Sequence, residues 1–142
     1  MTLSEARLLI TQCATRMNAR SGEVVFDEWA VVTLSSQGAK LAVYEGPRVE
    51  QFRLNFKTDI RPLQSELEGR QLAVGDFGFA AEAAGTAYDA CVRIGPTAYL
   101  WWNNTDASLT DIRETGGWLP AQKTFMELCE TFQQDPVVSE SD

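Results

Sequence analysis

The stretch TAYDACVRIGPTAYLWWN, Thr86 to Asn103, decides the fold class because it has the pattern of a β-hairpin. Apolar and polar residues alternate from Tyr88 to Ile94, which is the period of a strand with one buried face. Gly95-Pro96 interrupts the alternation, and an apolar run rich in aromatics extends from Ala98 to Trp102. The stretch therefore predicts two antiparallel strands joined by a short turn.

The aromatic side chains of the second strand must divide between its two faces, because successive side chains point to opposite sides. Tyr99 and Trp101 share one face, while Trp102 points to the other together with Leu100. One indole is therefore expected in the core and the other outward, and we expect Trp101 to be the outward one.

Towards the N-terminus the pattern predicts a helix followed by a strand pair. Thr2 with Glu5 three residues later has the capping-box pattern, and apolar residues recur at helical spacing until Ser21-Gly22. Strands are expected over residues 24–34 and 40–44, joined by a turn at Ser36-Gln37-Gly38. The helix is expected to bury one face, formed by Ala6, Leu9, Ile10, Cys13 and Met17.

The middle of the chain leaves an alternative open. Residues 48–57 fit a strand followed by a short helix that Asp59 caps and that ends before Gly69, but they also fit the start of one long helix. Pro62 disfavours the long helix. Residues 71–81 predict another strand, in which Gly75 and Gly78 mark a bulge or a close approach of the backbone.

The C-terminal part predicts a short helix from Ser108 and a longer one that opens at Trp118-Leu119-Pro120 and ends at Asp135-Pro136. The longer helix has a stripe for burial, formed by Ala121, Phe125, Leu128 and Phe132. Together these patterns predict a single α+β domain over residues 1–135, with an antiparallel sheet of five or six strands packed by N- and C-terminal helices. Residues 136–142 are expected to form a short, acidic, disordered tail.

Charge is placed unevenly along the chain. Its 142 residues carry a net charge of −8, and all of it falls in residues 71–142, where eleven acidic side chains face three basic ones. Nucleic acid is not expected as a partner, because its binding requires a basic surface. No apolar run has the length of a membrane span or of a secretion signal, so we expect a cytoplasmic protein without a membrane partner.

Few residues of the chain are suited to catalysis or to metal binding. The chain has no histidine, which removes the common general base and the usual zinc ligand, and its three cysteines are widely spaced and expected to be reduced. Asp76 and Asp89 lie on neighbouring predicted strands, but we expect both carboxylates to be exposed. We therefore predict no catalytic residue, no metal ligand and no cofactor, and more likely a protein without enzymatic activity.

Several parts of the chain resemble roadblock-type, profilin-like domains. They are the opening helix, the hairpin at residues 36–38, the helix before Gly69, and the hairpin at Gly95-Pro96 before the last helix. That resemblance implies a small bacterial-type cytosolic homodimer that binds protein and regulates Ras-like GTPases. The length, acidic balance and order of elements also resemble the dimeric chaperones of type III secretion.

A third class is an enzyme or small-ligand-binding protein with a pocket near Tyr99 and Trp101. For the protein-binding classes we expect recognition to lie on the hairpin and the segment after it, where aromatic anchors adjoin acidic charge. The expected interaction surface consists of Tyr99, Trp101, Trp102, Asp106 and Asp111. A homodimer is expected because the apolar stripe of the last helix exceeds what one small domain is expected to cover.

Overall fold

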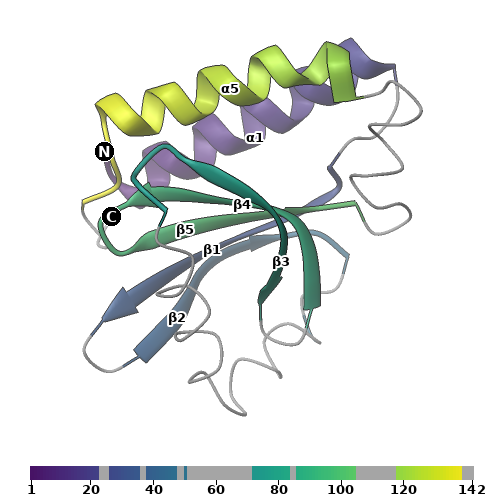
Figure 1. The fold of residues 1–142 in the computed structure, drawn as a ribbon. Helices are drawn as coiled ribbons and strands as arrows, with labels where there is room; N and C mark the ends of the chain where they lie inside the picture. The colour runs from purple at the N-terminus through teal and green to yellow at the C-terminus, as the bar shows by residue number, and fades with distance from the viewer. Residues whose placement is uncertain are drawn as a thin grey trace.

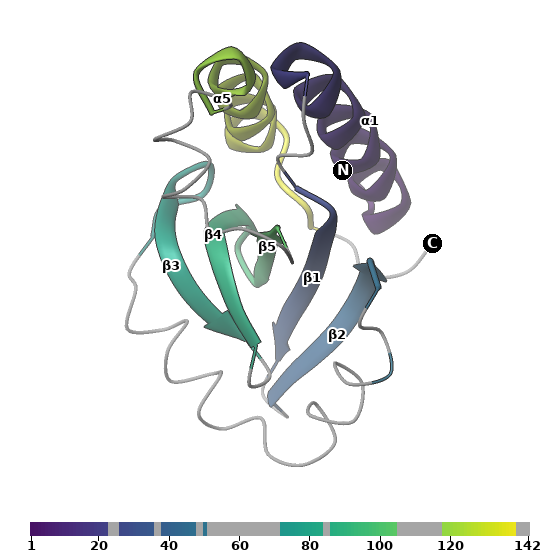
Figure 2. The same cartoon turned by 90° about the vertical axis from the view of Figure 1, so that its right-hand side faces the viewer.

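The computed structural model describes residues 1–22, 26–35, 38–47, 50, 72–83, 86–104 and 118–138. These residues form α1 (Leu3–Ser21), β1 (Glu28–Ser35), β2 (Gly38–Glu45), β3 (Phe77–Ala83), β4 (Thr86–Gly95), β5 (Ala98–Asn103) and α5 (Trp118–Gln134). The strands form one five-stranded antiparallel sheet in the order β2-β1-β5-β4-β3. Both helices lie on the same side of this sheet (Figures 1 and 2). The predicted α+β fold is confirmed.

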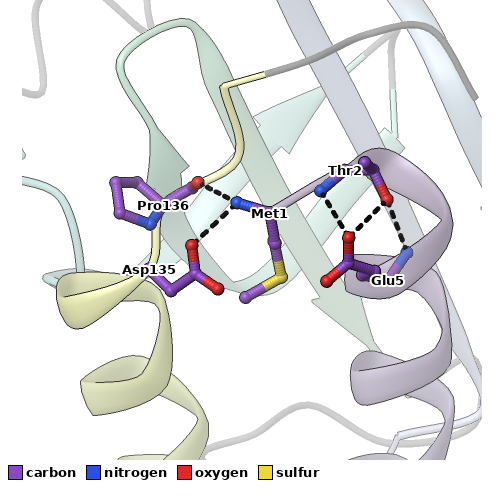
Figure 3. Close-up of polar contacts among 5 residues, drawn as sticks. All are labelled: Met1, Thr2, Glu5, Asp135 and Pro136. Carbon is purple, nitrogen blue, oxygen red and sulfur yellow. Dashed lines mark hydrogen bonds and ion pairs between the residues drawn. The ribbon is translucent and has the colours of Figure 1, made fainter.

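Helix α1 begins and ends where the sequence predicts. The Glu5 amide donates to Thr2 Oγ1 at 3.2 Å, and the Thr2 amide donates to Glu5 Oε1 at 3.5 Å (Figure 3). These reciprocal bonds satisfy amides that have no partner inside the helix. At the other end Gly22 has a φ of 70°, a left-handed conformation that glycine adopts without steric cost.

Both predicted hairpins are present, but β1 begins at Glu28 and not at residue 24. The reason lies in Asn18 on α1, whose side chain binds the backbone of Phe26. Its Nδ2 donates to the Phe26 carbonyl at 3.3 Å, and its Oδ1 accepts from the Phe26 amide at 3.4 Å. Phe26 is therefore held against the helix and not in a strand ladder.

Strand β3 also begins later than predicted, at Phe77 and not at residue 71. Gly75 precedes it in a turn with a φ of 90°, and its amide donates to the Arg93 carbonyl at 2.8 Å. A Cβ at this glycine would lie 2.8 Å from Gln133 Cβ and 3.0 Å from the Cys129 carbonyl oxygen. The predicted close approach is confirmed at Gly75, but it is an approach of a turn to α5.

The core fills the space between the sheet and the two helices. The Trp102 ring lies 4.9 Å from the Phe26 ring and 6.3 Å from the Phe125 ring, measured between centroids. The predicted stripe of α5 is buried at Ala121, Phe125, Leu128 and Phe132. On α1 the predicted face is buried except for Leu9, which is partly buried and packs against the core.

Residues 136–138, at the start of the expected C-terminal tail, pack against the rest of the fold. Val137 is buried, and its amide donates to the Ile94 carbonyl at 2.9 Å. The N-terminal ammonium of Met1 donates to Asp135 Oδ1 at 2.8 Å and to the Pro136 carbonyl at 2.7 Å (Figure 3). We call residues 136–138 the C-terminal strap, because they join the ends of both helices to the β4–β5 hairpin.

Two of the predicted elements lie outside the described residues. They are the segment for which strand and helix were both possible and the short helix expected from Ser108, which fall mainly in residues 51–71 and 105–117. Neither described helix is long and apolar enough to cross a bilayer.

Candidate functional site

Helices α1 and α5 cover one face of the sheet, and the opposite face carries most of its polar side chains. Alternation along each strand separates the two faces, and the core cluster identifies the face under the helices. We call the opposite side the second face. Its described residues include Glu28, Ala30, Val32, Tyr44, Cys91, Arg93, Tyr99, Trp101 and Asn103.

The second face contains the aromatic pair that the sequence places together. Tyr99 and Trp101 share this face with ring centroids 6.1 Å apart, and Trp102 points into the core, so the predicted alternation is confirmed. The expectation that Trp101 is exposed is wrong, because its relative exposure is 0%. Tyr99 and Trp102 are buried as well. The three aromatics are therefore buried, and Asp106 and Asp111 lie outside the described residues, so the expected interaction surface stays a prediction.

A buried carboxylate lies at one end of the second face. Glu28 has a relative exposure of 0%, and it faces Asn103 directly across the β1–β5 pair. The Tyr44 hydroxyl donates to Glu28 Oε2 at 2.6 Å, and Asn103 Nδ2 donates to Glu28 Oε1 at 3.3 Å. A separation of 2.6 Å is at the short end of the range for O–H···O hydrogen bonds. Such bonds are needed because burying an unpaired carboxylate is very costly.

Gly46 brings the chain close to this carboxylate after β2 ends. A Cβ on Gly46 would lie 2.8 Å from Glu28 Cγ and 3.0 Å from Tyr44 Oη, and its φ is 150°. Only glycine fits both the conformation and the space. Sequence reasoning missed Glu28, Tyr44 and Gly46 as a group. The signal that could have found it is a glutamate within an otherwise apolar strand.

Trp101 occupies the middle of the second face. Its neighbours across the sheet are small, with Ala30 directly opposite on β1 and Cys91 directly opposite on β4. The buried Trp101 Nε1 has no hydrogen-bond partner in the part of the chain that the structure describes. Trp102 Nε1 is also unpartnered there, but it lies on the apolar face among Phe26 and Phe125. Burying a hydrogen-bond donor without a partner costs about 1–3 kcal/mol of stability. An acceptor bound to either indole N–H would recover part of that cost.

Arg93 is the charged residue at the other end of the second face, and its role is structural. The guanidinium donates to the carbonyls of Leu72 at 2.8 Å, Pro96 at 2.7 Å and Gly95 at 3.3 Å. It also lies 5.8 Å from the centre of the Tyr99 ring. These bonds close the β4–β5 turn and attach residue 72 to it.

Replacing Arg93 with methionine should lower the free energy of unfolding by about 1–3 kcal/mol, because three carbonyls lose a charged donor at a partly exposed site. Urea denaturation measures the change. Arg93→Lys is the matched control, since it keeps the charge but not the planar fork, and it should be intermediate. An Arg93→Met protein as stable as the wild type would show that water replaces these bonds without cost.

The thiols of Cys13 on α1 and Cys129 on α5 are buried and poorly suited to act as nucleophiles. Cys13 Sγ lies 3.4 Å from Met17 Sδ and 3.7 Å from the Thr124 carbonyl. Burial raises the pKa of Cys13 and of Cys129 from 9.0 to about 12. The charge of Asp76 contributes a smaller increase for Cys129. Both thiols are therefore protonated and unreactive near neutral pH.

These thiols predict a pH dependence of stability. Since folding raises their pKa, they contribute stability that is fully present below pH 9 and is lost as the pH rises towards 12. The free energy of unfolding, measured by denaturant titration at a series of alkaline pH values, should fall along this range. A Cys13→Ala/Cys129→Ala protein should show a shallower fall, and equal slopes in the two proteins would contradict the assignment.

Other groups that the sequence singled out form no site in the described residues. No three metal-ligating side chains lie together in the part of the chain that the structure describes. Asp76 is exposed, as expected, whereas the side chain of Asp89 is outside the description. The carboxylate pair therefore stays untested, and the expected lack of metal and cofactor stays a prediction.

Comparison of the chain with family models, curated proteins and solved structures finds no match. The resemblances to roadblock-type domains and to secretion chaperones therefore stay predictions.

Proposed function

We propose that this chain is a non-catalytic small-ligand-binding domain, and that its site is the second face around Trp101 and Glu28. Of the three classes that the sequence leaves open, this is the one that expects a pocket near Tyr99 and Trp101. Burial of both rings argues against recognition by an exposed aromatic surface.

One observation carries the proposal. The second face combines a buried, hydrogen-bonded carboxylate with a buried indole whose N–H has no described partner. Binding sites for small molecules have this composition, in which apolar and aromatic walls surround a few placed polar groups. The polar groups come from β1, β2 and β5, so three strands hold them in fixed positions.

Fragment screening by ¹H–¹⁵N NMR tests the proposal on the whole chain. Binders should move the backbone signals of Glu28, Tyr44 and Asn103 and the indole signal of Trp101. Signals from the outer side of α1, such as that of the exposed Leu8, serve as the internal control and should stay unmoved. A screen whose binders all map to the helices, or which finds no binder, would refute the proposal.

The protein-binding homodimer stays a prediction, but the argument from the apolar stripe of α5 no longer supports it. The stripe of α5 is buried within a single chain, so it does not require a partner. The apolar residues that remain exposed on the described helices, Leu8, Leu119 and Met126, favour the prediction instead. The molar mass that light scattering gives at micromolar protein concentration should then exceed the 15.7 kDa of one chain. A single species of 15.7 kDa would contradict the dimer.

A further inference from the structure

We draw no further inference here: the strongest candidate, the open hollow on the exposed side of α1 that is lined by Thr11, Gln12, Thr15 and Arg16, carries nothing, because nothing in the described part of the chain shows what covers it.

Discussion

Replacing Trp101 with alanine should lower the free energy of unfolding by about 3–5 kcal/mol, the cost of removing a large buried aromatic side chain. The indole is fully buried and packs beside Tyr99 on the second face. For a domain of this size the melting temperature should fall by roughly 10 °C or more. Chemical denaturation and thermal melting followed by circular dichroism measure both quantities.

Two further variants control this result. Trp101→Phe retains most of the apolar volume, so it should recover the larger part of the loss. Trp102→Ala empties an equally buried site on the helix side of the same strand, and its cost should be comparable. If Trp101→Ala melted like the wild type while Trp102→Ala did not, the second face would lack the packing that its burial implies.

Local patterns were sufficient to predict most of the fold. The alternation in residues 86–103 predicted the hairpin and the division of its aromatics between two faces, which the structure confirms. The Thr2–Glu5 pair predicted the start of α1, and the stripe of Phe125 and Phe132 predicted the buried face of α5. In each case the signal lies within one element and follows from its geometry.

Contacts between distant segments could not be predicted in this way. Alternation assigns Trp101 to a face, but it does not say whether that face is covered, and so its exposure was predicted wrongly. The buried Glu28 is hydrogen-bonded to Tyr44 and to Asn103, and the latter lies 75 residues away. The C-terminal strap was missed for the same reason, since its partners are Met1 and the β4–β5 hairpin.

The second large effect is expected at Gly95, where the C-terminal strap passes directly over β4. A Cβ at this position would lie 2.1 Å from the Val137 carbonyl oxygen, far inside contact distance. Gly95→Ala should therefore displace the strap, expose Val137 and break its bond to Ile94. Together these losses are worth about 2–4 kcal/mol in the free energy of unfolding. The backbone itself adds no strain, because Gly95 is not among the positive-φ glycines of the described residues.

The same substitution in a chain that ends at Asp135, and so lacks the C-terminal strap, shows how much of the loss is due to the clash with Val137. Without the strap, alanine at residue 95 meets no carbonyl, and replacing a strand glycine should then be neutral or stabilising by up to about 1 kcal/mol. The same change thus destabilises the full chain and not the truncated one. Denaturant titration of the four proteins gives the coupling between Gly95 and the strap. If alanine costs the same in both backgrounds, the strap does not rest on Gly95, and the loss has its origin within β4.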